Sequence, residues 1–263
     1  MPLGTMLREF SFRLGSLLTR QPSLRVLFDQ TQLASAYRRW QNAGLTIQTV
    51  YDVGAHRGGW SQACLPLFPR ARFHCFDPLP YAEAWARSQA KVQFHQLLLG
   101  DRETEVPFYS TGSTGDSIYR ESTRWYRDQP PQLLPMHRLE TVVKQQQLLP
   151  PDLLKIDAQG AELDILRGSA SLLPAISLIQ LECSLVPYNS GAPLIGAVID
   201  QLRDWGFLVA AIEPIVFTAM RSSRFGYPDG AFIPQADVLF VAQRLCHLDR
   251  FRDCLALGAP ATP

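Results

Sequence analysis

From about residue 46 onward, the sequence alternates short apolar, β-branched runs with longer stretches of helical character. The runs that predict strands are residues 46–53, 72–76, 92–99, 105–109, 152–156, 177–183, 207–212 and 238–242. The stretches that predict helices are residues 58–67, 81–90, 139–147, 161–168 and 194–205. Strands that alternate with helices form a mostly parallel sheet with helices on both faces, joined by right-handed crossovers. The sequence therefore predicts an α/β domain.

The N-terminal part differs from the rest of the chain. Residues 1–50 carry a net charge of +4, whereas residues 51–263 carry −3. Apolar side chains in Met1–Arg20 recur at helical spacing with arginines between them, which predicts an amphipathic helix. That helix either docks on its own domain or contacts a membrane surface or a partner; an organelle transit peptide is a further alternative. The predicted division is a basic helical extension (1–45), a main domain (46–245) and a C-terminal tail (246–263).

The composition excludes several classes of protein. Hydrophobic residues make up 46% of the chain and charged residues 19%, which is too apolar for a disordered protein. A net charge of +1 lacks the surplus of Lys and Arg that a nucleic-acid binder needs. No apolar run reaches the ~18–20 residues of a membrane span. The five cysteines include no Cys-x-x-Cys pair and no Cys/His cluster, which predicts reduced thiols and no metal site in a cytoplasmic, at most membrane-peripheral, protein.

The first two predicted strands end in residues suited to a nucleoside ligand, and ligands of such sheets bind at the carboxyl ends of strands. Asp52 lies near the end of the first strand. Gly54 then allows a tight turn, and Gly58 lets the next helix approach a ligand closely. Neither the dinucleotide-binding pattern GxGxxG nor a P-loop is present. Asp77, at the end of the second strand, is placed to accept hydrogen bonds from two ribose hydroxyls, unless it only caps the following helix.

Charged residues also mark the later strand ends. Asp101 follows the third predicted strand and could bond an adenine edge or form a turn. Lys155 and Asp157 interrupt an apolar run at alternate positions, so they face the same side of the sheet. Glu182 lies at the end of the next strand. With the two earlier carboxylates, four acids surround one crevice and favour a cationic ligand; S-adenosylmethionine, with its sulfonium, ammonium and ribose diol, fits this pattern.

Residues 110–135 are polar and lack periodicity, which is typical of a functional loop or lid. The candidates within this loop for shaping an acceptor pocket are Ser113, Asp116, Ser117 and Tyr119. Trp125 and Tyr126 could stack on a sugar or simply pack against the protein.

Two stretches of the chain resemble the FkbM family of S-adenosylmethionine-dependent methyltransferases. They are DVGAHRG (52–58) and LKIDAQGAELDILRG (154–168). Shorter similar segments are residues 76–80, 99–101, 138–139, 229–230 and 236–237. The resemblance covers roughly residues 46–243. It implies a class I methyltransferase fold, a mostly parallel seven-stranded Rossmann-like sheet, and methyl transfer to a hydroxyl of a sugar, a glycan or glycolipid, or another natural product.

Three positions depart from the family pattern. Asp77 stands where the family usually has Glu, His56 often corresponds to Asn, and Gln159 replaces a frequent Glu. Spacing and resemblance together assign cofactor binding to Asp52, Gly54, Ala55, His56, Gly58, Asp77, Pro78, Gly100, Asp101, Asp157 and Gln159. The departures keep cofactor binding possible and leave the small-molecule or glycan acceptor open.

Methyl transfer to an alcohol requires alignment of the acceptor oxygen and a base that takes its proton. Asp157 is the first candidate for the base. Lys155 is its partner or orients the acceptor, unless it is only half of a structural ion pair. Glu182 and His137 are the alternative bases, although a lone loop histidine is often merely solvated. Three other functions stay open: an NAD-type oxidoreductase, a catalytically inactive methyltransferase-like binding module, and an RNA methyltransferase, which the overall charge disfavours.

Overall fold

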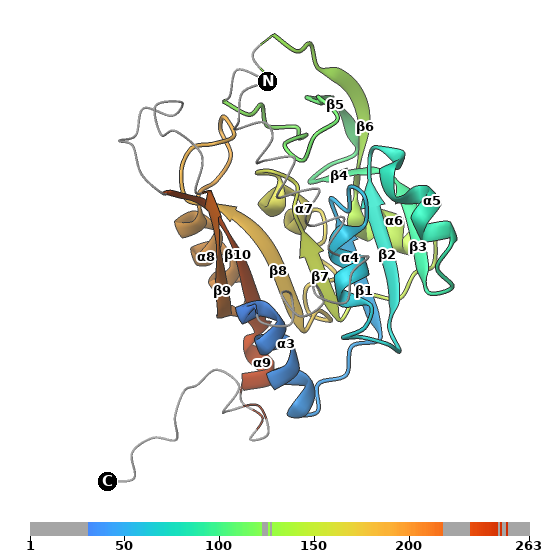
Figure 1. Cartoon of the computed structure of the whole chain (residues 1–263), viewed down its shortest axis with the longest axis vertical. Coiled ribbons are helices and arrows are strands. Elements are labelled where there is room, and N and C mark those ends of the chain that lie inside the picture. Colours follow the sequence, from blue (N-terminus) through green and yellow to red (C-terminus); the bar gives the residue numbers. More distant parts are fainter. Residues whose placement is uncertain are drawn as a thin grey trace.

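The computed structural model describes residues 31–122, 126, 128–217, 232–246, 248 and 251, and it centres on a seven-stranded sheet of order β3-β2-β1-β7-β8-β10-β9 (Figure 1). Its strands are β1 (Thr49–Val53), β2 (Arg72–Asp77), β3 (Val92–Gln96), β7 (Leu153–Ile156), β8 (Leu178–Ser184), β9 (Phe207–Phe217) and β10 (Phe232–Ala242). The pairs β3-β2, β2-β1, β1-β7 and β7-β8 are parallel, whereas β10 is antiparallel to both neighbours. The predicted mostly parallel α/β sheet is thereby confirmed. Met1–Arg20, Trp125 and nearly all of the predicted tail lie outside the described residues.

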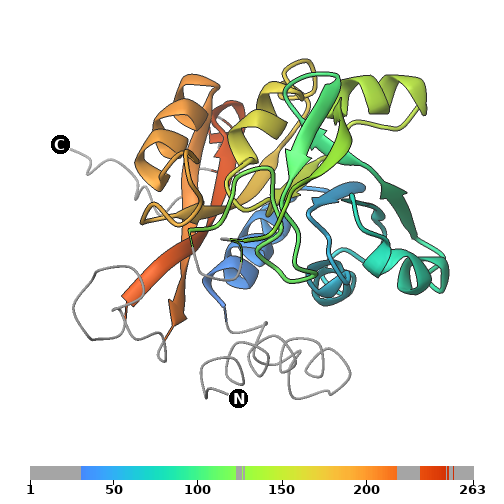
Figure 2. The ribbon, with the colours of Figure 1, turned by 90° about the horizontal axis from the view of Figure 1, so that it is seen from above.

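Helices cover both faces of this sheet. They are α3 (Gln32–Asn42), α4 (Gly59–Cys64), α5 (Glu83–Arg87), α6 (Leu139–Gln145), α7 (Glu162–Arg167), α8 (Ile195–Asp204) and α9 (Gln243–Cys246), with a 3₁₀ turn, η1, at Pro80–Ala82. Figure 2 shows α6, α7 and α8 along one face and α3 and α4 along the other. Each face has its own apolar core, because alternate residues of every buried strand point to opposite sides.

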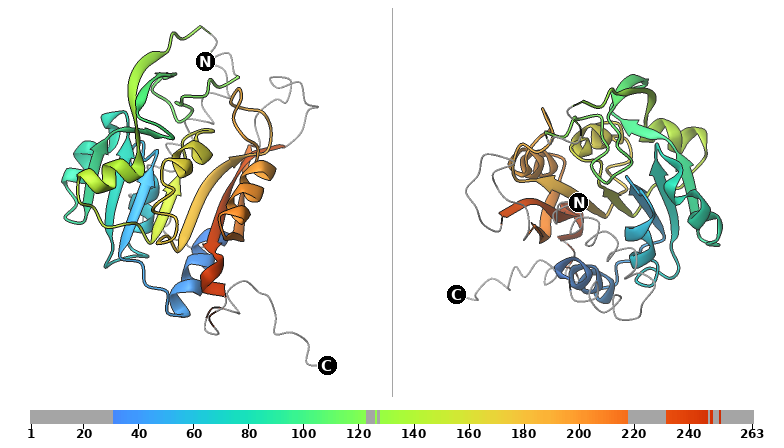
Figure 3. Two further views of the ribbon diagram at one scale, coloured as in Figure 1. Left: turned by 180° about the vertical axis from the view of Figure 1, so that it is seen from behind. Right: turned by 45° about the horizontal axis from the view of Figure 1, so that its top comes forward.

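Helix α3 belongs to the basic extension but shares the core of the main domain. Leu33, Tyr37 and Trp40 are buried against the sheet, and the Trp40 ring lies 5.4 Å from that of Phe251. Thr31 caps the helix, because its Oγ1 accepts a hydrogen bond from the backbone N–H of Ala34 at 3.1 Å. Figure 3 shows α3 beside α9 at one end of the sheet. This part of the extension is therefore packed as one unit with the domain that follows it.

A smaller sheet corrects two sequence-based expectations. It has the order β4-β6-β5, with β4 at Leu98–Gly100, β5 at Thr104–Phe108 and β6 at Gln132–Arg138. The single strand predicted over 92–99 is therefore two strands in different sheets. β6 occupies the end of the predicted loop, and it escaped prediction because only Met136 in it is fully buried, so no apolar alternation is visible. Elsewhere, β9 and β10 are longer than predicted, and the helix predicted over 81–90 is reduced to η1 and α5.

Two further expectations concern cysteines and membrane spans. Cys64, Cys75 and Cys183 are buried free thiols, and Cys246 is half-buried. None of the helices in the described part of the chain is long and apolar enough to cross a membrane.

A pair of buried histidines makes stability depend on pH. His74 Nδ1 lies 3.0 Å from His95 Nε2 between β2 and β3, and both rings are buried. Burial, and secondly the charge of His95, lower the pKa of His74 from 6.5 to about 4; burial also lowers the pKa of His95. Between these pH values the unfolded chain binds more protons than the native one, so the free energy of unfolding should fall as the pH decreases from 6.5 toward 4.

We expect His74→Gln to remove part of this loss, measured by urea unfolding at about pH 7.5 and about pH 5. The matched control is His137→Gln, since His137 is partly exposed and sits in the smaller sheet. It should retain the pH dependence of the unmodified protein. Equal pH dependence in His74→Gln and in the unmodified protein would contradict the assignment to this pair.

Candidate active site

The turn after β1 brings the ends of β1, β2 and β7 into contact. Gly54 has φ +71°, and a Cβ there would lie 1.8 Å from the carbonyl oxygen of Asp157. The backbone N–H groups of Gly54 and Ala55 both donate to the carbonyl of Phe76, at 2.9 and 3.2 Å. Positive φ and the close approach of two backbones both require glycine here. The predicted glycine turn is therefore the point at which three strand ends meet.

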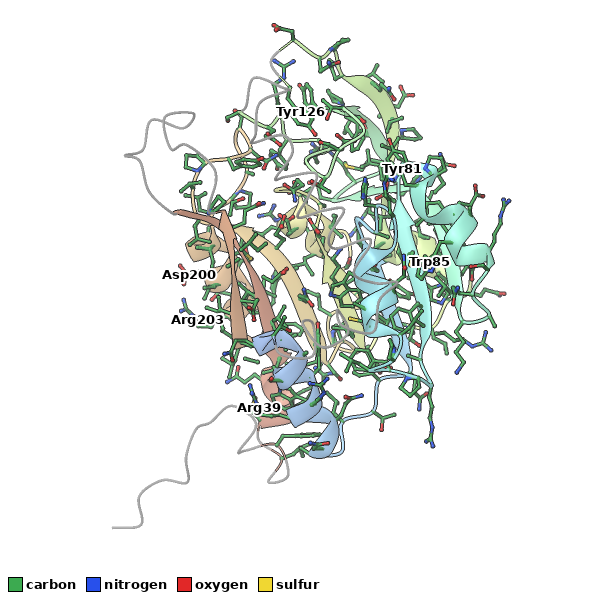
Figure 4. The ribbon with its side chains drawn as sticks, in the orientation of Figure 1. Arg39, Tyr81, Trp85, Tyr126, Asp200 and Arg203 are labelled. Carbon is green, nitrogen blue, oxygen red and sulfur yellow. The ribbon has the colours of Figure 1, made fainter. Side chains whose placement is uncertain are left out.

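The second glycine of the motif precedes α4. Gly58 has φ +76°, and a Cβ there would lie 2.4 Å from the Trp85 ring. Arg57 stacks over the Tyr81 ring at 5.6 Å. Figure 4 shows Tyr81 and Trp85 on the η1 and α5 side of the molecule. Gly58 thus lets α4 start close to this aromatic group, which stands beside the end of β2.

Asp77 is held in a fixed orientation at the end of β2. It is 8% exposed, and its Oδ2 and Oδ1 accept backbone hydrogen bonds from His56 at 2.8 Å and Leu79 at 2.9 Å. Burial raises its pKa from 3.8 to about 6, although both backbone hydrogen bonds oppose the rise. The His56 ring packs edge-on against the Tyr81 ring, with 5.2 Å between the ring centroids. Pro78, the residue after Asp77, is half-buried. A carboxylate has about four lone-pair sites, so this one keeps acceptor capacity for a ligand.

Lys155 forms the centre of a buried charge cluster. Its Nζ lies 2.9 Å from Asp52 Oδ1 and 3.6 Å from Asp157 Oδ2, and it donates to the carbonyl of Gly54 at 3.2 Å. Burial by itself would lower the pKa of Lys155, but the carboxylates of Asp52 and Asp157 raise it above its ordinary value. The other oxygen of Asp52 accepts from Ser61 Oγ at 2.7 Å, and Asp52 is fully buried. Asp52 therefore supports Lys155, and its predicted contact with a cofactor stays a prediction.

The open side of this cluster carries two carboxyl groups linked by amides. The Asp157 side chain is 35% exposed, and its Oδ1 accepts from Gln159 Nε2 at 3.0 Å. Glu182 Oε2 accepts from Gln159 as well and, at 2.9 Å, from Gln235 Nε2. Burial, and next the charge of Asp157, raise the pKa of Glu182 well above its ordinary value. These surroundings disfavour the charged form of Glu182, whereas the Asp157 side chain is partly open to solvent.

The first part of the predicted lid is attached to the turn after β7. Ser117 Oγ donates to the carbonyl of Ala158 at 2.9 Å, and the Tyr119 hydroxyl donates to Asp164 of α7 at 2.6 Å. The donors to Asp116 are Ser110 Oγ, the N–H groups of Thr111 and Gly112, and the Tyr126 hydroxyl. These bonds hold residues 110–122 over the carboxyl end of β7, where Asp157 lies.

The structure leaves three candidate residues apart from this cluster. His137 lies on β6, and its Nδ1 is 2.9 Å from Glu103 Oε2. This contact is at the exposed surface of the smaller sheet. Gly100 packs against Gly168, where a Cβ would lie 1.9 Å from the carbonyl oxygen of Gly100, which indicates a packing role. Asp101 forms a loose pair with the next residue at 3.6 Å.

Sequence reasoning assigned no role to several residues that complete the site. They are Tyr37, Trp60, Gln180, Gln235 and Asp237. Gln180 and Asp237 interrupt buried apolar strands, which is the same signal that singled out Lys155. Tyr37 and Trp60 carry no such signal, because an aromatic residue on a helix usually only packs.

Comparison with known proteins places the chain in a family. Residues 52–209 match the family model described as the methyltransferase FkbM domain. The 2-O-methyltransferase NoeI of Sinorhizobium fredii (strain NBRC 101917 / NGR234) is 25% identical over 170 residues, which cover 58% of this chain and 70% of that protein. The solved precorrin-6y C5,15-methyltransferase of Geobacter metallireducens GS-15 is 13% identical with a TM-score of 0.43, covering 84% of this chain and 89% of its own.

A methyltransferase structure from Aquifex aeolicus is 11% identical with a TM-score of 0.40, covering 87% of this chain and 98% of its own. The family match includes the glycine turn, Asp77, Lys155, Asp157 and Glu182, and it extends over more than half of the chain. The sequence resemblance is thus confirmed, and the chain belongs to the FkbM-domain family of methyltransferases.

Proposed function

We propose that this protein transfers the methyl group of S-adenosylmethionine to a hydroxyl oxygen of a sugar or another small molecule. The observation that carries the proposal is the convergence of the glycine turn, Asp77 and Asp157 at the ends of neighbouring parallel strands. β2, β1 and β7 are adjacent in the sheet, and ligands of such sheets bind at this edge.

The residues at this edge fit the cofactor. Asp77 is oriented by two backbone donors and keeps lone pairs for the ribose hydroxyls. Gly54 and Gly58 hold positive φ values that set the course of the turn between β1 and α4, beside Asp77. The carboxylates of Asp77 and Asp157 suit a ligand with cationic groups. When bound, S-adenosylmethionine supplies a methyl group on a sulfonium, a good leaving group.

On this proposal, Asp157 accepts the proton of the acceptor hydroxyl. Its side chain is 35% exposed, whereas burial and the charge of Asp157 raise the pKa of Glu182 well above its ordinary value. Lys155 and Gln159 each contact one oxygen of Asp157 and so fix the direction in which the carboxylate points. The segment 110–122 is attached to the residue after Asp157, through Ser117 and the carbonyl of Ala158. Alignment of the acceptor and exclusion of water contribute most to such a reaction, about 7–11 kcal/mol in favourable cases.

Two observations support oxygen as the methylated atom and a neutral acceptor. The relative NoeI is named a 2-O-methyltransferase. The cluster around Asp157 is acidic and amide-rich, which suits hydroxyl groups and disfavours phosphate or carboxylate groups. Incubation with labelled methyl donor and cell extract, followed by separation into glycan, lipid, small-molecule and RNA fractions, identifies the acceptor class.

Replacing Asp77 by alanine is expected to weaken the binding of S-adenosylhomocysteine about 100-fold, because two hydrogen bonds to a charged acceptor are lost. Isothermal titration calorimetry measures the dissociation constant directly. The matched control is Asp77→Glu, which retains the carboxylate and should bind within about tenfold of the unmodified protein. Absence of binding to the unmodified protein would refute the proposed function, and unchanged binding by Asp77→Ala would refute the role of this residue.

A further inference from the structure

A chain of hydrogen bonds connects α3 to the sheet beside the charge cluster. The Tyr37 hydroxyl donates to Gln180 Oε1 at 2.5 Å, and Gln180 Nε2 donates to Asp237 Oδ1 at 3.2 Å. Tyr37 is fully buried and Gln180 is 1% exposed, so water cannot replace these partners. Both ends of this chain, Tyr37 and Asp237, lie outside the family-matched residues 52–209.

The contacts of Gln180 determine which way its amide faces. The indole N–H of Trp60 lies 3.1 Å from the same oxygen that accepts from Tyr37. An indole N–H can only donate, so the atom it meets must be the carbonyl oxygen of the amide. The amide N–H then faces Asp237. A flipped amide would leave two buried donors without an acceptor and turn an oxygen toward a carboxylate, which is unfavourable.

This amide lies next to the groups of the candidate active site. Gln180 is the register neighbour of Lys155, and Asp237 is the register neighbour of Glu182. The charged and titratable groups of the described chain that interact with Asp237 are Asp157 and Lys155 at the β7 end, Glu182 and the Cys183 thiol of β8, Glu213 of β9, Tyr37 of α3 and the Cys64 thiol of α4. Burial, and next the charge of Asp157, raise the pKa of Asp237 to about 6, while the hydrogen bond from Gln180 lowers it.

We propose that Tyr37 is a positioning residue of the methyl-transfer site: its hydroxyl holds the Gln180 amide so that the amide N–H faces the Asp237 carboxylate. The proposal rests on the proposed function only in naming the site as one of methyl transfer. Helix α3 then has two roles: it packs against the sheet, and through Tyr37 it orients a side chain of the site. Loss of the hydroxyl frees the amide to turn, and Asp237 then binds its proton more tightly.

The direct test is the titration of Asp237 by NMR in protein labelled with ¹³C at the aspartate carboxyls. The Asp237 signal is identified by its absence in Asp237→Asn. In Tyr37→Phe its midpoint should rise by about half to one pH unit, the effect of one hydrogen bond. The matched control is Tyr51→Phe, which removes a hydroxyl that donates to the carbonyl of Leu149 at 2.8 Å, and it should leave the midpoint unchanged.

A second variant tests the same connection without altering α3. Gln180→Met removes the donor itself and should raise the Asp237 midpoint, and Tyr37→Phe added to it should cause no further rise. If one variant fails to fold, the other decides. An unchanged midpoint in every folded variant of Tyr37 and Gln180 overturns the proposal.

The kinetic test follows once labelled methyl donor identifies an acceptor fraction. The acid limb of the pH profile of methyl transfer should move in Tyr37→Phe, because the charge of Asp237 acts on the proposed base Asp157, and the affinity for S-adenosylhomocysteine should stay within about twofold. Absence of methyl transfer by the unmodified protein counts against the proposed function alone, because the NMR titration decides the position of Tyr37 independently.

Discussion

Replacing Lys155 by methionine is expected to lower the free energy of unfolding by about 3–5 kcal/mol, because it leaves a buried carboxylate without its cation. Lys155 Nζ lies 2.9 Å from Asp52 Oδ1, and the two side chains are 5% and 0% exposed. Neither charge can be compensated by water at this depth. Urea unfolding followed by circular dichroism measures the change, and an unchanged m-value shows that the variant still unfolds in one step.

A surface ion pair provides the matched control. Arg203 and Asp200 on the outer side of α8 lie 2.8 Å apart, with side chains 61% and 66% exposed (Figure 4). Arg203→Met should cost less than about 1 kcal/mol, because exposed pairs contribute little. The double variant Lys155→Met, Asp52→Asn should recover much of the loss, since the uncompensated charge is gone. Equal free energies of unfolding for Lys155→Met and Arg203→Met would show that the buried ammonium of Lys155 does not stabilise the folded protein.

Replacing Asp157 by asparagine is expected to slow methyl transfer by about 10²–10⁴-fold while leaving cofactor binding nearly unchanged. An amide has almost the same shape as the carboxylate, but it cannot take a proton from the acceptor hydroxyl. Asp157 is also held at both oxygens, by Lys155 and Gln159, so little movement is expected. Single-turnover transfer of labelled methyl groups to the acceptor fraction measures the rate, and calorimetry with S-adenosylhomocysteine measures binding.

Two further variants separate the three candidate bases. Glu182→Gln should reduce the rate less than Asp157→Asn, because the raised pKa of Glu182 disfavours its charged form and a neutral glutamine can still form hydrogen bonds there. His137→Gln should transfer methyl groups at the normal rate, since His137 lies on β6 beside Glu103. A large loss in His137→Gln with normal transfer by Asp157→Asn would reverse the assignment of the base.

The ends of the parallel strands were the most predictable part of the site. Asp77, Lys155 and Asp157 stand out in the sequence because a charged residue inside or directly after an apolar run is costly unless it is paired or used. The glycines of the first turn were predictable for a related reason: a residue with positive φ in close backbone contact has no good alternative. Parallel pairing of the strands then brings these residues to the same edge of the sheet, independently of the conformation of the loops.

The smaller sheet was much harder to predict. β6 exposes most of its side chains, so its sequence carries no alternation, and it pairs with β4 and β5 across a long loop. The same holds for the hydrogen bond between Tyr37 and Gln180, whose partners are 143 residues apart. Contacts of this kind depend on how helices and strands pack, and single-sequence patterns report only local preferences.

Local patterns in the chain predict the parallel α/β sheet, the glycine turn and the carboxylates at the strand ends, because periodicity, positive φ and charged residues within apolar runs are visible in short stretches of sequence. The different environments of those carboxylates depend on the folded arrangement. It buries Asp52 beside Lys155, raises the pKa of Glu182, leaves Asp157 partly exposed and separates His137 from them. Burial and neighbouring charge set the protonation of a carboxyl group, and both are properties of the folded arrangement.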